Sequence, residues 1–140
     1  MSGVRQATIS DIAGMHRVRV AVRENRLVDP GRITTSDYAA AIESLGRGWV
    51  AEVDGEIVAF AVGYASGNIW ALFVHPDHEG RGHGRALHAQ MVDWLWSLGL
   101  GRLWLTTAPG SRAEGFYRSL GWHPQGIEAG GDVRMGLTRP

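Results

Sequence analysis

Apolar positions along the chain follow two spacings, one typical of strands and one typical of helices. Short apolar runs bounded by turn residues predict strands at Val4–Ala7, Trp49–Val53, Glu56–Tyr64, Ile69–Val74, Arg102–Thr107, Trp122–Gln125 and Val133–Leu137. Apolar stripes at helical spacing predict helices that begin near Thr8, Thr34, Gly84 and Ser111. The first two helices each open on the pattern of a capping box, with Asp three residues after Thr8 and after Thr34.

The order of these elements predicts how the strands pair. Asp54 and Gly55 form a hairpin signal between two predicted strands, and Ser66–Asn68 marks the next turn, which predicts an antiparallel meander of three strands. Ile69–Val74 and Arg102–Thr107 are separated by the long helix, and a strand–helix–strand succession predicts a parallel pair with a right-handed crossover. We therefore expect an α/β (α+β) fold in a single domain over residues 1–140, with a mixed, mostly antiparallel central sheet and flanking helices.

A glycine-rich loop joins the strand Ile69–Val74 to the long helix. Pro76 ends the strand, and glycines follow at positions 80, 82 and 84. Glycines at a helix start let a ligand approach the backbone, and the free N–H groups and helix dipole favour an anion there. A P-loop would need a lysine, and the chain contains none. A dinucleotide-binding loop would need Gly-x-Gly-x-x-Gly and an acidic residue about 20 positions later, which the sequence matches poorly.

Two motifs of the chain resemble those of the GNAT superfamily, the acyl-CoA-dependent N-acyltransferases. Glu79-Gly80-Arg81-Gly82-His83-Gly84 resembles the family's Gln/Arg-x-x-Gly-x-Gly/Ala signature. About 30 residues later, Ala113-Glu114-Gly115-Phe116-Tyr117-Arg118-Ser119-Leu120-Gly121-Trp122 resembles its Ala-x-x-Phe-Tyr-x-x-Leu-Gly-Phe signature. The two motifs stand in the family's order, and the element order of the whole chain agrees with it.

The resemblance implies acetyl-CoA as cosubstrate, with the backbone of the glycine loop around its pyrophosphate. It implies that the strands before and after the long helix start as a pair and splay apart, so that the pantetheine arm lies between them. It also implies that the first two helices line the cleft for the acceptor. The cofactor-binding residues implied in this way are Phe73, Val74, Glu79, Gly80, Arg81, Gly82, His83, Gly84 and Arg85. The side chains of Arg81 and Arg85 could pair with phosphate oxygens or be solvated.

The resemblance also implies a general acid. Tyr117 stands where the family places a tyrosine near the CoA sulfur, and a neutral phenol can protonate a leaving thiolate. The general base is open, because the strand before the loop has no carboxylate. His75 is the best local substitute, with Glu24, Asp77 and His78 as rivals, although His75 could equally be a structural residue at the strand end. Further departures from the family pattern are Glu79, whose charge would repel a pyrophosphate, and Gly110, where the family often has Asn.

Composition narrows the possible partners. The 14 basic residues, all arginine, balance 14 acidic residues, so the chain has no bulk charge for nucleic acid or an anionic membrane. The absence of cysteine excludes an acyl-cysteine intermediate. The N-terminus lacks an apolar signal segment and no 18-residue apolar run occurs, so we expect a cytoplasmic protein. His83 and His88 are five residues apart on a helix and do not share a face, and we expect no metal site.

Together these observations predict an N-acetyltransferase that moves an acetyl group from acetyl-CoA to an amine of a small molecule or a protein, by direct transfer in a ternary complex. Two alternatives stay open: an acyl-CoA-binding module without catalysis, and a nucleotide-binding regulatory protein. Trp96 lies off the apolar stripe of the long helix formed by Leu87, Met91, Trp94, Leu95 and Leu98. An exposed tryptophan there would indicate a contact surface, such as that of a homodimer.

Overall fold

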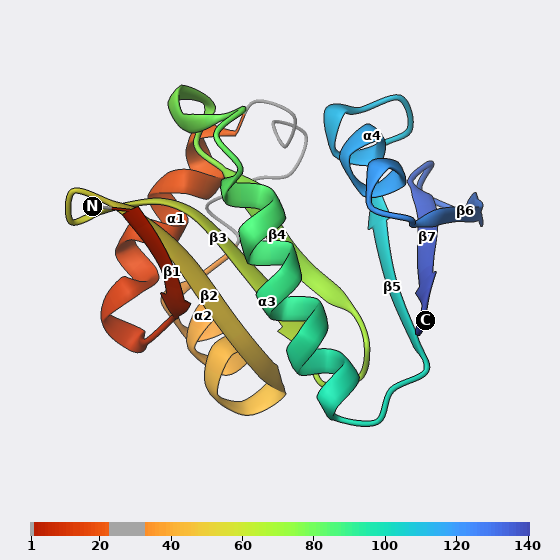
Figure 1. The fold of residues 1–140 in the computed structure, drawn as a ribbon, viewed down its shortest axis with the longest axis horizontal. Helices are drawn as coiled ribbons and strands as arrows, with labels where there is room; N and C mark the ends of the chain where they lie inside the picture. The colour runs from red at the N-terminus through yellow and green to blue at the C-terminus, as the bar shows by residue number, and fades with distance from the viewer. Residues whose placement is uncertain (1, 23–32) are drawn as a thin grey trace.

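The computed structural model of the protein describes residues 2–22 and 33–140, and its strands form two antiparallel sheets (Figure 1). The first sheet has the order β1-β2-β3-β4, made of β1 (Ser2–Gln6), β2 (Gly46–Val53), β3 (Glu56–Tyr64) and β4 (Ile69–Val74). The predicted hairpin joins β2 to β3, where Asp54 has φ 52° and Gly55 has φ 81°. Two successive positive φ angles are typical of the turn that matches the twist of paired strands. The predicted meander is therefore confirmed.

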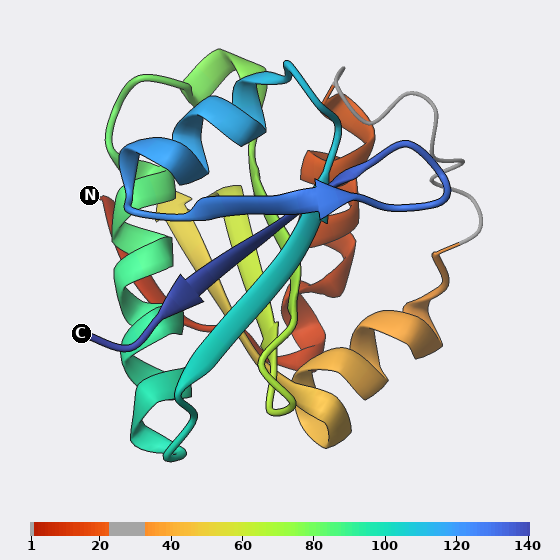
Figure 2. The ribbon, with the colours of Figure 1, turned by 90° about the vertical axis from the view of Figure 1, so that its right-hand side faces the viewer.

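Helices cover both faces of the first sheet, as Figure 2 shows from the side. α1 (Ile12–Ala21) and α2 (Thr35–Ala40) pack on one face, and α3 (His83–Ser97) packs on the other. A 3-10 turn, Ile9–Asp11, precedes α1, and a π-helical turn, Ala41–Leu45, follows α2. Both predicted capping boxes form: the Thr8 N–H donates to Asp11 Oδ2 at 2.8 Å, and the Thr34 N–H donates to Asp37 Oδ2 at 2.7 Å.

The second sheet has the order β5-β7-β6, made of β5 (Arg102–Thr107), β6 (His123–Ile127) and β7 (Val133–Thr138). α4 (Arg112–Ser119) connects β5 to β6. β6 is the outer strand, exposed at every position, and its register shifts between Pro124 and Gly126. The final antiparallel pair predicted from sequence is therefore present, with β6 starting one residue later than expected.

The two sheets meet where β4 and β5 begin. One parallel bridge joins Asn68 to Trp104, the Asn68 amide donates to the Trp104 carbonyl at 3.2 Å, and the Trp104 N–H donates to the Gly67 carbonyl at 2.9 Å. No longer parallel ladder follows in the described part of the chain, and β5 leads away from β4 toward α4 (Figure 1). The expectation of one mixed sheet is thus corrected: two antiparallel sheets share a single parallel step, because β5 diverges from β4 beyond the Asn68–Trp104 bridge and its continuous ladder is the one with β7.

One large apolar cluster joins α3 to both sheets, and a second lies under α1 and α2. Leu98, which belongs to the predicted apolar stripe of the long helix, is 44% exposed, and Leu45 is 51% exposed. Each lies at the end of its helix, where the chain turns away from the core. Trp96 is half-buried and packs against the large cluster, so its ring offers less free surface than a fully exposed side chain would.

Candidate active site

The end of β4, the glycine loop and the start of α3 form one continuous turn. A 3-10 helix, Pro76–His78, directly follows β4, and His75 caps it by accepting a hydrogen bond at Nδ1 from the Asp77 N–H at 3.1 Å. Gly80 and Gly82 have φ angles of 75° and 87°, and Gly82 is the N-cap of α3. A helix leaves its first N–H groups without partners inside the helix, so those of His83, Gly84 and Arg85 are available to an anion.

The three glycines of the loop have different roles. A Cβ at Gly80 or Gly82 would meet no atom within 4 Å, so these residues keep the backbone left-handed and uncovered. A Cβ at Gly84 would lie 3.3 Å from the Phe116 ring and 3.6 Å from Val74 Cγ2. Gly84 therefore lets the start of α3 pack closely on Phe116 of α4 and on Val74 at the end of β4. This contact brings together the two motifs noted in the sequence.

Basic groups surround the loop. Arg81 Nη1 lies 3.4 Å from His78 Nδ1, and the His78 ring lies beside that of His83. Burial lowers the pKa of His83 first, and the nearby His78 and Arg81 lower it further. An anion bound at this loop would raise the pKa of His83 and so offset the effects of His78 and Arg81. The site is therefore electrostatically suited to a phosphate.

Glu79 does not leave an unpaired negative charge at the loop. Its carboxylate forms an ion pair with Arg112, the first residue of α4. The repulsion expected from Glu79 is thus countered by an arginine that the sequence analysis did not single out. The same pair adds a second contact between the loop and α4.

Tyr117 lies on α4 and is buried, with 6% of its surface exposed. Its ring contacts Phe116 and Trp122 edge-on. Burial raises the pKa of its phenol well above the ordinary value, so the hydroxyl keeps its proton at neutral pH. Gly110, in the place of the family's Asn, donates its N–H to Glu114 at 2.9 Å, so Glu114 fastens the loop before α4. This hydrogen bond is the main cause of the lowered pKa of Glu114.

His88 and Trp122 form a buried pair that the sequence did not reveal as a pair. The Trp122 indole N–H donates to His88 Nε2 at 2.9 Å, and the His88 ring also meets Phe116 edge-on. Burial, with a smaller effect of Arg85, lowers the pKa of His88 to about 4. His88 is therefore neutral and acts as an acceptor. The sequence signal for a buried His88 was its position next to Leu87, on the apolar side of the predicted long helix.

None of the general-base candidates among the described residues is well placed to accept a substrate proton. Because His75 Nδ1 accepts the Asp77 N–H, the proton of the neutral ring is on Nε2, which leaves no free lone pair for a substrate proton. The Asp77 side chain is 84% exposed, and His78 faces Arg81. Glu24 lies outside the described residues. His75 and Asp77 thus come together in the cap of the 3-10 helix, and no general base is identified among the described residues.

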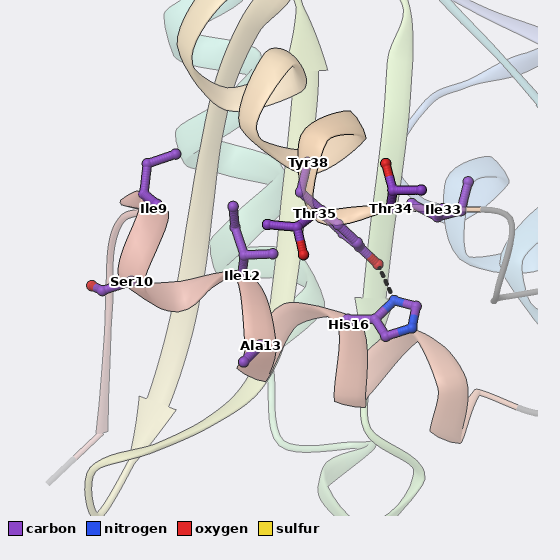
Figure 3. A pocket seen from close by; sticks show the side chains of 9 residues that line it. All are labelled: Ile9, Ser10, Ile12, Ala13, His16, Ile33, Thr34, Thr35 and Tyr38. Atoms are coloured by element: carbon purple, nitrogen blue, oxygen red, sulfur yellow. Dashed lines mark hydrogen bonds between the residues drawn. The ribbon is translucent and has the colours of Figure 1, made fainter.

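A pocket of about 600 Å³ lies between α1 and α2, on the other side of the first sheet from α3 (Figure 3). Across it, His16 Nδ1 and the Tyr38 hydroxyl form a hydrogen bond of 2.9 Å. The other lining residues are apolar or carry small hydroxyls: Ile9, Ser10, Ile12, Ala13, Ile33, Thr34 and Thr35. The sequence analysis placed the acceptor cleft at these helices but did not identify His16 and Tyr38.

Residues 2–22 and 33–140 contain neither a metal-binding cluster nor a membrane-spanning helix. No group of three or more His, Asp or Glu side chains there is arranged to hold a metal ion. None of the helices in this part of the chain is long and apolar enough to cross a membrane.

Comparison with known proteins agrees with the geometry. The sequence pattern of the family described as "Acetyltransferase (GNAT) family" matches residues 15–122. The chain belongs to this family. A relative, an L-2,4-diaminobutyric acid acetyltransferase from Nocardia farcinica (strain IFM 10152), is 30% identical over 120 residues, which are 79% of this chain. The chain spans 58% of the length of that relative.

Solved structures of other GNAT proteins have the same fold. The ribosomal-protein-S18-alanine N-acetyltransferase from Escherichia coli matches with a TM-score of 0.79 at 20% identity, over 99% of this chain and 94% of the other. The PaiA N-acetyltransferase from Thermoplasma acidophilum, in complex with coenzyme A, matches with a TM-score of 0.86 at 11% identity, over 99% of both chains. At such identities the likeness concerns the fold alone.

Proposed function

We propose that this GNAT protein is an N-acetyltransferase that moves an acetyl group from acetyl-CoA to an amine in a ternary complex, with residues 1–140 acting as one domain. The observation that carries the proposal is the convergence, through the Gly84–Phe116 contact, of the end of β4, the α3 N-terminus and the Tyr117 helix. A phosphate site, an open strand end and a buried proton donor are the three parts that this reaction requires.

In this proposal each part of the site holds one part of acetyl-CoA. The backbone from Gly80 to Arg85 binds the pyrophosphate, with Glu79 neutralised by Arg112. The pantetheine arm lies where β4 and β5 diverge and hydrogen-bonds to the open edge of β4 at Val74, as an added strand would, while the Phe73 backbone faces β3. The Val74 N–H then polarises the thioester carbonyl.

The chemical step needs two proton movements. The amine nitrogen attacks the thioester carbon, the C–S bond breaks, the amine loses a proton and the leaving sulfur gains one. Tyr117 gives its proton to the sulfur; the phenol is protonated at neutral pH, and the burial that raises its pKa makes it a weaker acid than a solvated phenol. His75, whose Nδ1 accepts the Asp77 N–H, caps the turn after β4, and the amine proton passes to solvent. No cysteine exists to carry the acetyl group, so transfer is direct.

The acceptor is proposed as a small amine, in keeping with the diamino acid named for the Nocardia relative. A cytoplasmic location and a homodimer stay predictions from the sequence. The second candidate function, an acyl-CoA-binding module without catalysis, is favoured by the lack of an assigned base.

Two measurements test the proposal. Calorimetry with acetyl-CoA, CoA, ATP and NAD should show binding of the two CoA compounds only. Thiol release from acetyl-CoA should then appear when amines are added, and the protein itself gives no thiol background. Binding without thiol release across amines, diamino acids and peptide N-termini would support the binding module. Binding of ATP or NAD instead of acetyl-CoA would refute both.

A further inference from the structure

Arg19 lies on α1 and stacks on aromatic rings of β4, the strand that leads to the proposed thioester site. Its guanidinium carbon is 5.4 Å from the centre of the Trp70 ring and 4.9 Å from that of Phe73. The Trp70 ring is in turn stacked on Tyr64 and meets Tyr38 edge-on. The cation is thus held by flat apolar surfaces on the α1 side of β4, one of which is the ring of Phe73, the residue before Val74.

The guanidinium has unused hydrogen-bonding capacity. Within the described residues, its Nη1 is buried and has no hydrogen-bond partner, and no carboxylate forms an ion pair with Arg19. Stacking on the ring faces stabilises part of the positive charge, but the rings accept no hydrogen bonds from the N–H groups in the plane of the guanidinium. A buried donor without a partner is unfavourable, and an arginine edge is shaped for two parallel hydrogen bonds to a carboxylate.

The surroundings of Arg19 favour an anion. Burial raises the pKa of Tyr38 and of Tyr64, so both neighbouring phenols stay neutral, and the Arg19 charge opposes that rise in each case. Asp37 also acts on Tyr64, but its carboxylate is engaged in capping α2. Within the described residues, the cluster therefore combines a cation that has no carboxylate partner and one free N–H group, Nη1, with neutral hydroxyls, of which that of Tyr38 also interacts with Arg19, and with aromatic walls.

We propose that Arg19 binds the carboxylate of the acceptor, which makes the acceptor class a free amino acid rather than a simple amine or a peptide N-terminus. This inference rests on the proposed acetyl transfer. A small rotation of the guanidinium is required, since Nη1 is buried, and stacking on flat rings tolerates such a rotation. The amine of the same molecule would then extend toward the end of β4.

The test compares amino acids with the amines left by their decarboxylation: L-2,4-diaminobutyrate with 1,3-diaminopropane, L-ornithine with putrescine, and L-lysine with cadaverine. Calorimetry in the presence of saturating CoA measures binding directly, without relying on turnover. The variants are Arg19→Met and, as a matched control, Arg17→Met. Arg17 is on the same helix but points to Glu56 and the Ile57 carbonyl.

We expect the native protein to bind at least one amino acid about tenfold or more tightly than its decarboxylated partner, since charged hydrogen bonds contribute at this scale. Arg19→Met should abolish this preference, and Arg17→Met should retain it. Far-ultraviolet circular dichroism checks folding. If Arg19→Met does not fold, Arg19→Lys, which keeps the charge but loses the planar fork, should reduce the preference severalfold.

Equal binding of both members of every pair by the native protein, or a preference that survives in the Arg19 variants, overturns the inference. Thiol release tells this failure from that of the proposed function. Release with amines regardless of a carboxylate would keep the acetyltransferase and remove the role of Arg19. Arg19-dependent binding of an amino acid without release would keep the carboxylate site and remove the acetyl transfer.

Discussion

The buried His88–Trp122 pair makes the stability of the fold depend on pH. Folding lowers the pKa of His88 from 6.5 to about 4, mainly through burial. The stability that comes from keeping His88 neutral is fully present above 6.5 and is lost as the pH falls toward 4, because the unfolded chain then takes up the proton first. Complete protonation would cost about 3 kcal/mol, and the loss between about pH 7 and about pH 5 is about 2 kcal/mol.

The perturbation that isolates this effect is His88→Gln. Glutamine does not titrate, and its side-chain oxygen can accept the Trp122 N–H in place of Nε2. We expect the variant to lose up to about 1.5 kcal/mol at neutral pH from imperfect packing. Between about pH 7 and about pH 5, its free energy of unfolding should fall by about 2 kcal/mol less than that of the native protein.

Urea unfolding followed by tryptophan fluorescence, at several values between about pH 7 and about pH 5, measures both free energies. The difference between the two proteins removes the titration of all other groups. If the native protein and His88→Gln lose stability in parallel, His88 titrates normally and the reasoning from burial is wrong.

The remaining predictions concern the site. Tyr117→Phe should lower the single-turnover rate of acetyl transfer about 100-fold with acetyl-CoA affinity changed less than about threefold, and a native rate in quenched-flow would mean that the proton comes from elsewhere. Gly82→Val should weaken acetyl-CoA binding at least about tenfold by calorimetry, because φ 87° is strained for a β-branched residue; unchanged affinity in a folded variant would remove the loop from the binding site. Arg112→Met should weaken CoA binding about threefold by leaving Glu79 unpaired, and Glu79→Gln added to it should restore affinity; a double variant as weak as the single one would contradict this.

Much of the fold follows from local signals. The bounds of β3, β4 and β5 were predicted to the residue, because turn residues and Pro76 interrupt the chain where each strand ends. The division into two sheets could not be predicted in this way. Whether β4 and β5 continue side by side past Asn68 depends on how two distant segments diverge, which apolar periodicity does not encode.

In the site too, contiguous motifs could be predicted from the sequence and contacts between distant residues could not. The glycine loop and Tyr117 are visible in sequence because each belongs to a contiguous motif. The pairing of Glu79 with Arg112, and the stacking of Arg19 on β4, join residues that are far apart in the chain. Even within the motif, the packing role of Gly84 became apparent only from its distance to Phe116.

The outer strand β6 limits how this protein could polymerise. An open strand edge can recruit another chain through backbone hydrogen bonds, and proteins resist this with proline or an irregular register. Pro124 supplies no N–H, and the shift between Pro124 and Gly126 breaks the spacing that an incoming strand would need. A second copy therefore cannot extend the second sheet in register through β6. Fibre-like growth from this edge is disfavoured even though the whole strand faces water.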